Sequence, residues 1–303
     1  MATAAWRFGM GVLALLVALL LLGLAADLLG DPVSRQLGPE GMDAAGLAAA
    51  RGAFGLDAPA LTRLFAPLLD LARGDLGTST WLRRPAGEAV GQALGITLRL
   101  AALAWPLGLA GGALLGLVLA ALPPGLARVP LLLLSVPGFV VAVLAVEVFA
   151  VQLGWVPAAG YSGLVSLLLP ALLLAAALAV KLGLLLQDRL RGMRREPFIA
   201  FAEARGLPVM RLLLVYRLLP ASTLLARYGA LQAGYLLGGA LVVETVFALP
   251  GLGRLAVLAL QHADLPLLRA AMLAAGIGFL LARFAAELAQ AALDPRPSAA
   301  VLA

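Results

Sequence analysis

Long apolar stretches alternate with shorter polar stretches along this chain. A helix needs about 20 apolar residues to cross the hydrocarbon core of a bilayer. Stretches of about that length or more lie at residues 8–29, 93–122, 129–153, 164–186, 221–249 and 267–288. The pattern predicts an all-α integral membrane protein with about six transmembrane helices. An even number of spans brings both termini to one side of the membrane, and we assign that side to the cytoplasm.

The N-terminal part divides into an apolar helix and a polar segment. We interpret residues 1–29 as a retained transmembrane helix, because its apolar core is longer than that of a usual signal peptide. Cleavage near Gly23-Leu24-Ala25 remains the alternative. Residues 30–91 are rich in Gly, Pro and Asp and predict a periplasmic segment of short helices. Its arginines oppose the positive-inside tendency, which is weaker for long translocated segments.

Residues 92–290 form the predicted transmembrane core, and residues 291–303 form a predicted cytoplasmic tail. Within the third stretch, Pro137-Gly138 predicts a kink. A polar loop at residues 187–220 contains seven Arg and interrupts the core. Arginine gathers in cytoplasmic loops, so we place this loop in the cytoplasm.

The polar loop contains the signals of a short helix. Pro197 suits the first helical position, Gly206 suits the left-handed conformation that ends a helix, and Pro208 prevents continuation. One predicted face carries Phe198, Phe201, Ala202 and Arg205. This face predicts docking onto another protein on the cytoplasmic side. The alternative is a basic amphipathic helix that lies on anionic lipid.

The composition supports a lipid environment and excludes several kinds of site. Hydrophobic residues make up 63% of the chain and charged residues 13%, with a mean hydropathy of +1.02. The net charge of +6 does not indicate a nucleic-acid partner, because the arginines lie in loops between apolar stretches. Cysteine is absent and His262 is the only histidine, which excludes thiolate or histidine metal cages and a histidine-based triad.

Ionisable residues inside the predicted spans are candidates for function, because an acid at mid-membrane costs about 2.5–3.5 kcal/mol on insertion scales. They are Glu147, Lys181, Arg227, Glu244, Arg283 and Glu287. We interpret Lys181, Arg227, Arg283 and Glu287 as structural, since they lie near predicted helix ends. Glu244 either accepts from backbone N–H groups of the following loop or lines a pathway. No role is assigned to Glu147.

An ATP site of the phosphate-cradling type is excluded. Such a loop ends in Gly-Lys-Ser or Gly-Lys-Thr. The only lysine, Lys181, lies between Val180 and Leu182. ATP-driven transport would therefore need a separate ATPase subunit.

Several short motifs carry a family resemblance over nearly the whole chain. They are Gly30-Asp31-Pro32-Val33, Arg73-Gly74-Asp75-Leu76-Gly77-Thr78-Ser79, Ala202-Glu203-Ala204-Arg205-Gly206-Leu207, Val243-Glu244-Thr245-Val246-Phe247, Leu249-Pro250-Gly251-Leu252-Gly253, Asp264-Leu265-Pro266 and Asp294-Pro295-Arg296. With these motifs the chain resembles the inner-membrane permease subunits of binding-protein-dependent ABC importers of the dipeptide, oligopeptide and nickel type. It departs from the family at Glu203, where Arg or Lys is usual, and at Leu224, where Pro is frequent.

The resemblance implies a type I (MetI-like) permease architecture and two groups of site residues. Coupling to the ATPase would involve Pro197, Phe198, Phe201, Ala202, Glu203, Ala204, Arg205, Gly206 and Leu207. The pathway or its outer gate would involve Glu244, Phe247, Pro250, Gly251 and Gly253.

The resemblance also implies partners and cargo. The partners would be a second homologous permease in a heterodimer, two cytoplasmic ATPases that bind Mg-ATP, and a periplasmic binding protein. The chain would be a non-catalytic, multi-pass subunit of the bacterial inner membrane with no cofactor of its own. Peptides are the expected cargo, and nickel or another metal chelate is the alternative. A self-contained secondary transporter is the alternative from another class, although the sequence shows no clear internal repeat.

Overall fold

The computed structural model describes residues 2–28, 73–123, 125–193 and 196–293, together with 62, 65, 66 and 69–71. In this part of the chain the structure is helical apart from turns and one isolated antiparallel bridge between Thr78 and Pro85, which confirms the all-α prediction for these residues. The turn at 30–33, the segment 30–61 and the tail from residue 294 lie outside the described residues.

The chain divides into two compact units. Unit 1 comprises Met1–Thr97 and Pro250–Leu280, and unit 2 comprises Leu98–Leu249 and Leu281–Ala303. This division reflects contacts within the fold. The predicted borders at residues 29, 91 and 290 separate membrane-spanning from non-spanning segments, and they stay predictions.

Long helices dominate the described chain. They are α1 (Ala2–Leu28), α5 (Ala86–Ala121), α8 (Leu164–Met193), α11 (Leu219–Val246) and α13 (Leu265–Leu293). Three described stretches are long and apolar enough to cross a membrane, namely Ala86–Ala121, Leu164–Met193 and Leu265–Leu288. Shorter apolar helical stretches lie at Phe8–Leu24, Gly138–Gln152 and Leu252–Gln261. A multi-pass membrane protein is therefore supported, and the count of about six spans stays a prediction.

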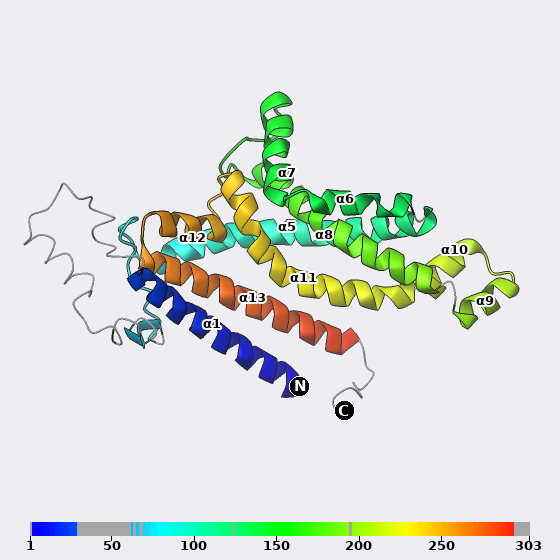
Figure 1. Ribbon diagram of the computed structural model, residues 1–303, viewed down its shortest axis with the longest axis horizontal. Coiled ribbons are helices and arrows are strands. Elements are labelled where there is room, and N and C mark those ends of the chain that lie inside the picture. Colours follow the sequence, from blue (N-terminus) through cyan, green and yellow to red (C-terminus); the bar gives the residue numbers. More distant parts are fainter. Residues whose placement is uncertain are drawn as a thin grey trace, which may run out of the picture. The chain divides into compact units, whose positions relative to one another are not determined.

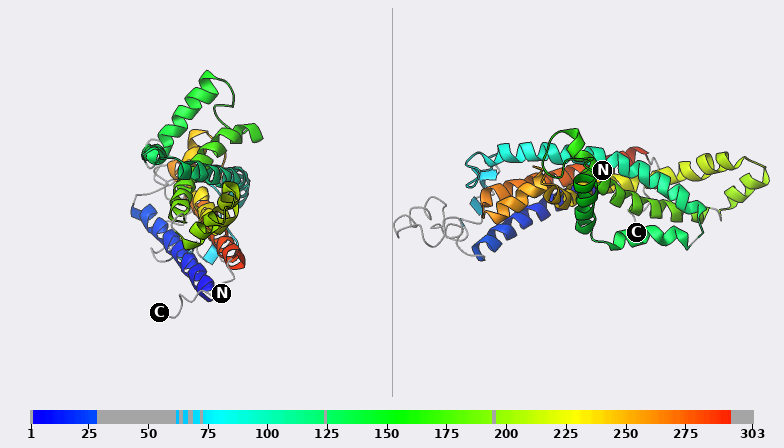
Figure 2. Two further views of the ribbon diagram at one scale, coloured as in Figure 1. Left: turned by 90° about the vertical axis from the view of Figure 1, so that its right-hand side faces the viewer. Right: turned by 90° about the horizontal axis from the view of Figure 1, so that it is seen from above.

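The third predicted span is not one continuous helix. After the short turn η1 (Leu126–Arg128), the chain forms α6 (Val129–Ser135), α7 (Gly138–Ala145) and the π-helix η2 (Val146–Gln152). The expected kink at Pro137 is a complete break, and α6 and α7 point in different directions (Figures 1 and 2). The reason is local, because a proline restricts the preceding residue to extended conformations and cannot donate a backbone hydrogen bond.

In unit 1, small and apolar residues hold the helices together. One core joins the first turns of α5 to α12 (Leu252–Gln261) and α13, and it comprises Ala86, Ala89, Val90, Ala93, Leu252, Ala259, Leu267, Leu268, Ala270 and Ala271. Glycines let α1 approach α13, since Gly11 faces Leu280 and Gly276 faces Leu15.

In unit 2, α5 and α8 pack through a row of glycines. A Cβ atom added at Gly116 would lie 2.7 Å from Leu186 Cβ and 2.9 Å from the Gly183 carbonyl oxygen. Gly108 and Gly112 face Leu178 and Leu182 in the same way. Small residues at such positions allow two helix backbones to approach closely in lipid, where packing contributes most of the association energy.

We expect Gly116→Ala to destabilise the protein by roughly 1–3 kcal/mol, because the added methyl group overlaps backbone as well as side-chain atoms. The matched control is Gly91→Ala on the same helix, where a Cβ atom meets nothing within 4 Å. There the gain in helix propensity predicts unchanged or slightly increased stability. Thermal unfolding in detergent measures both changes, and equal effects in the two variants would contradict the proposed close packing of α5 on α8.

Candidate functional site

The short helix predicted in the polar loop exists as α9 (Pro197–Ala204), and its cytoplasmic location stays a prediction. It begins with Pro197 after Glu196, whose backbone is extended at φ −75° and ψ 134°. It ends before Gly206, which has φ +70° and donates its N–H to the Glu203 carbonyl at 2.9 Å. Proline at the start and left-handed glycine at the end are therefore confirmed, and the chain has the conformation that these two residues favour.

The two sides of α9 have different neighbours. Ile199 and Ala202 are buried, and α9 packs against the π-helix η3 (Leu212–Leu218). Phe198 and Phe201 are 45% and 66% exposed. The prediction of one outward docking face is therefore wrong for Ala202, which packs inward on its own chain. Both phenylalanines face outward as predicted.

The other predicted coupling residues surround this aromatic pair. Glu203, Ala204, Arg205 and Gly206 are exposed, as is Pro197, and Leu207 is partly buried. The Arg205 guanidinium carbon lies 5.7 Å from the centre of the Phe201 ring, a cation–π arrangement. The exposed surface of α9 therefore combines two aromatic rings with both signs of charge.

Arginines connect the surroundings of α9 to the long helices of unit 2. Arg217, in η3, donates to the Leu190 carbonyl of α8 at 2.9 Å. Arg191, in the last turn of α8, donates to the Leu119 and Leu122 carbonyls at 2.9 and 2.6 Å. Carbonyls at a helix C-terminus lack intrahelical partners, and arginine satisfies them here. Sequence reasoning treated these two arginines only as loop charges, although arginine near a helix end is a known capping signal.

The predicted outer-gate residues fall into both units. Glu244 and Phe247 close α11 in unit 2 and are buried, with exposures of 0% and 2%. The Glu244 carbonyl accepts from Leu249 N–H at 2.9 Å, and the Phe247 carbonyl accepts from Gly160 N–H at 2.9 Å. A buried carboxylate is held by polar partners. Because the hydrogen bond to Leu249 is made by the Glu244 backbone carbonyl, both interpretations of its carboxylate stay predictions.

The other three predicted gate residues belong to unit 1, where Pro250 and Gly251 precede α12 and Gly253 lies in its first turn. Gly251 is the residue immediately before the helix. The first helical N–H, at Leu252, donates to Thr97 Oγ1 at 2.8 Å. Sequence reasoning missed Thr97, a buried side chain from α5 that satisfies this N–H across 155 positions of sequence.

A second polar centre in unit 1 surrounds Asp264, which the sequence indicated only as part of a family motif. Asp264 is fully buried, and its Oδ2 accepts from Ser79 Oγ at 2.5 Å and from Trp81 N–H at 3.1 Å. Its Oδ1 accepts from Leu267 N–H at 3.0 Å in the first turn of α13. The rings of Trp81 and His262 stack with centroids 4.2 Å apart. Asp264 therefore joins residues 79–81 to the start of α13.

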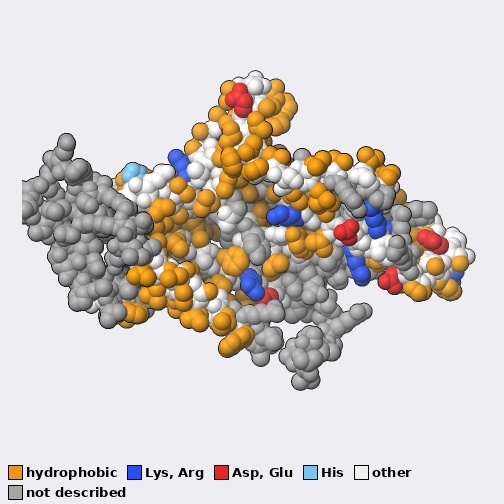
Figure 3. Space-filling model, in the orientation of Figure 1, with side chains coloured by type: hydrophobic (Ala, Val, Ile, Leu, Met, Phe, Trp, Pro, Cys, Tyr) orange, Lys and Arg blue, Asp and Glu red, His pale blue; other side chains and the backbone are white. Residues whose placement is uncertain are grey.

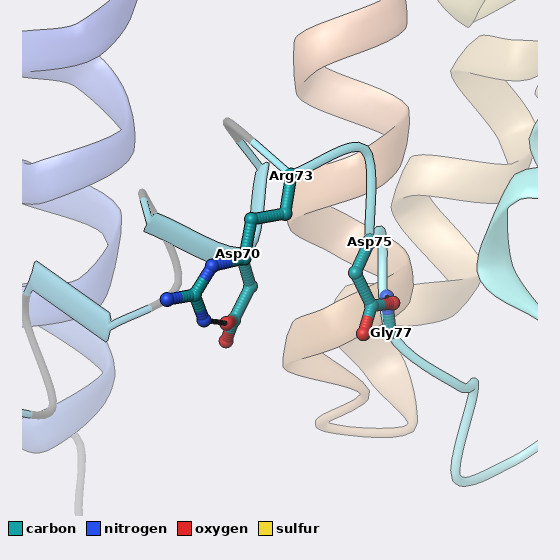
Figure 4. A network of polar contacts seen from close by, with 4 residues as sticks. All are labelled: Asp70, Arg73, Asp75 and Gly77. Carbon is teal, nitrogen blue, oxygen red and sulfur yellow. Dashed lines mark hydrogen bonds and ion pairs between the residues drawn. The ribbon is translucent and has the colours of Figure 1, made fainter.

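The turn that precedes Ser79 is built from local contacts (Figure 4). Asp75 Oδ1 accepts from Gly77 N–H at 2.8 Å, and Gly74 and Gly77 have φ of +81° and +73°. Arg73 and Asp70 form an exposed ion pair at 3.7 Å, a type that contributes little stability. This turn therefore orients the chain toward Ser79 and brings no group of its own to Asp264.

Apart from the buried Glu244, the ionisable residues of the predicted spans occupy ordinary surroundings where they are described. Glu147 accepts from Gln152 Nε2 at 3.2 Å on an exposed surface, and Arg283 pairs with Glu287 at 3.5 Å. Lys181 is exposed, and the side chain of Arg227 lies outside the described residues. No group of three or more His, Cys, Asp or Glu that could hold a metal occurs among the described residues. Exposed apolar side chains cover much of the helical surface instead (Figure 3).

The comparisons with known proteins agree with this arrangement. Residues 108–299 match the family described as "Binding-protein-dependent transport system inner membrane component". A protein of Brucella abortus (strain 2308), whose name assigns it provisionally to a peptide transport system as a permease, is 33% identical over 295 residues, which covers 93% of this chain and 94% of that protein.

The glutathione transport system permease protein GsiC of Pectobacterium atrosepticum is 32% identical over 289 residues, covering 93% of this chain and 94% of that protein. GsiC of Escherichia coli O6:H1 is 31% identical over 271 residues, covering 88% of each chain. The chain therefore belongs to the family of binding-protein-dependent transport system inner membrane components, the permease subunits of ABC importers.

Proposed function

We propose that this protein forms half of the translocation pathway of an ATP-driven peptide importer in the bacterial inner membrane. A periplasmic binding protein delivers the cargo, a second homologous permease completes the pathway, and two cytoplasmic ATPases hydrolyse Mg-ATP. The protein itself catalyses no reaction and binds no cofactor. The names of the relatives, which mention peptides and glutathione, support peptides over a nickel chelate.

The observation that carries this proposal is the two-sided packing of α9. Ile199 and Ala202 anchor the helix to its own chain, and Phe198 and Phe201 are exposed. Exposed aromatic pairs on a polar loop are typical of protein contacts. A partner that moves α9 also moves η3, and Arg217 passes the displacement to α8. An ATPase that closes on ATP would supply this movement.

Reconstitution into vesicles tests the proposal. We expect uptake of a labelled tripeptide only when the second permease, both ATPases, the binding protein and Mg-ATP are all present. A proton uncoupler should leave this uptake unchanged, because ATP is the energy source. Uptake without any ATPase, or its loss on uncoupling while ATP stays high, would favour the secondary transporter instead.

A further inference from the structure

Unit 1 contains a cavity of about 320 Å³ between the start of α5 and α12. Its wall is mainly apolar and includes Ile96, Leu255 and Leu258. Trp81 borders it, and the same indole stacks on His262. The volume lies at the lower end of the range of small-molecule sites, which combine apolar walls with a few convergent polar groups.

The charged groups of this cavity are cationic, and Gln92 adds a neutral amide. Arg84 and Arg254 both line it, and none of its described lining residues is an Asp or Glu. Arg84 Nη1 donates to Gln92 Oε1 at 3.1 Å, and both residues line the cavity. Guanidinium groups bind carboxylates with two parallel hydrogen bonds where the geometry allows. The positive charge of the two arginines therefore favours an anionic ligand group, and the apolar wall favours an apolar group next to that anion.

The segment that carries Trp81 and Arg84 is held in a fixed conformation. Ser79 N–H donates to the Arg84 carbonyl at 2.9 Å, and Arg83 N–H donates to the Ser79 carbonyl at 3.0 Å. Asp264 binds both Ser79 Oγ and Trp81 N–H from the opposite turn. When the residues that border a site are already held in one conformation, less conformational entropy is lost on ligand binding.

The two turns that meet at Asp264, around Arg83 and around Ala263, each contain a residue with a strained backbone. Arg83 and Ala263 have φ of +51° and +52°, a conformation that is uncommon outside glycine. Arg83 directly precedes Arg84, and Ala263 lies between His262 and Asp264. Such strain persists only where the surrounding contacts enforce it, and it gathers at functional sites.

We propose that this cavity binds the terminal carboxylate of a short peptide, with the apolar side chain of its last residue against Ile96, Leu255 and Leu258. Arg84 and Arg254 hold the carboxylate, and Trp81 covers the side chain. The peptide class of ligand rests on the proposed function, whereas the requirement for a carboxylate rests on the cavity itself. The other occupant would be an acidic side chain of the binding protein, and the apolar wall beside the arginines favours the small molecule with its apolar side chain.

Calorimetric titration of the full-length protein, purified with the second permease and without ATPases, tests this site. The probes are the dipeptide Ala-Leu and its C-terminal amide, which lacks the carboxylate. We expect Ala-Leu to bind and the amide to bind at least about tenfold more weakly, since the charge-assisted pair is lost. Arg254→Gln and Arg84→Gln should each weaken Ala-Leu by about tenfold or more, and Arg254→Lys should weaken it less.

Arg73→Gln is the matched control. It removes the same charge from an exposed position of unit 1 outside the cavity, where Arg73 pairs only weakly with Asp70. Binding of Ala-Leu should be unchanged in this variant. A thermal unfolding curve for each variant separates lost binding from lost folding, and Arg254→Lys, which keeps the charge, tests the site if Arg254→Gln does not fold.

Three results would overturn the proposal. Equal binding of Ala-Leu and its amide would show that no carboxylate is recognised. Unchanged binding in folded Arg254→Gln and Arg84→Gln variants would place the ligand elsewhere. No binding of Ala-Leu, combined with loss of binding-protein association in the same variants, would assign the arginines to a protein contact. Because no ATPase takes part, these outcomes are independent of whether reconstituted uptake needs ATP.

Discussion

Phe201→Asp is expected to abolish ATP-driven uptake while the protein remains folded and inserted in the membrane. The side chain is 66% exposed, so the fold does not depend on its packing. In the proposed assembly the same side chain is buried against an ATPase, where an unpaired carboxylate is costly to desolvate. The measurement pairs uptake in reconstituted vesicles with the amount of permease recovered in the membrane. The ATPase activity of the complex should no longer respond to the loaded binding protein.

Leu126→Asp is the control for this change. Leu126 is 57% exposed in the turn η1, outside α9, so it receives the same chemical change at a similar exposure. Its uptake should stay near that of the unchanged protein. Full uptake in Phe201→Asp, or an equal loss in both variants, would remove α9 as the coupling element.

The end of α9 offers an independent check on the same element. A Cβ atom at Gly206 would meet nothing within 4 Å, so any effect of Gly206→Val comes from its φ of +70°. Valine tolerates this conformation poorly and asparagine tolerates it better. We expect Gly206→Val to lose uptake and Gly206→Asn to keep a substantial part of it. Equal uptake in the two variants would show that the left-handed helix end is not needed for coupling.

Asp264→Ala is expected to have the largest effect on stability. Asp264 is fully buried, and the substitution removes the acceptor of two buried donors, Ser79 Oγ–H and Leu267 N–H, and of the partly buried Trp81 N–H. Each buried donor left without a partner costs roughly 1–3 kcal/mol. The total therefore approaches a large fraction of the stability of a typical domain.

Thermal unfolding and limited proteolysis near residue 81 measure this effect. Asp75→Ala is the control, because it removes one exposed acceptor, at Gly77 N–H, from the same segment. It should cost much less than Asp264→Ala. Asp264→Asn keeps one carbonyl oxygen and should lie between the two. Similar stabilities for Asp264→Ala and Asp75→Ala would refute the role of Asp264 as the buried connection of this segment.

The sequence predicted the parts of the fold that depend on local chemistry. Proline before α9 and left-handed Gly206 after it act within one helical turn, so their effect is readable without a structure. The apolar stretches predicted helices for the same reason. The break at Pro137 was underestimated as a kink, because spacing alone does not show whether the chain continues in one direction after a proline.

The sequence did not predict contacts between distant segments. Ser79 and Asp264 are separated by 185 positions, and Thr97 and Leu252 by 155. Nothing in their local sequence pairs them, although Asp264 before Leu265-Pro266 is a recognisable helix-capping signal. The inward packing of Ala202 escaped prediction for the same reason, since helical spacing groups residues by face without showing which neighbour each face meets.

The length of α8 bears on where its C-terminal end lies. The helix has 30 residues, which at 1.5 Å per residue gives a length of about 45 Å. The hydrocarbon core of a bilayer is about 30 Å thick. Its apolar part ends near Leu186, so the turns from Gln187 to Met193 extend about 10 Å beyond the hydrocarbon core. In the proposed assembly these turns separate α9 from the lipid tails, so that Phe198 and Phe201 can contact a water-soluble ATPase.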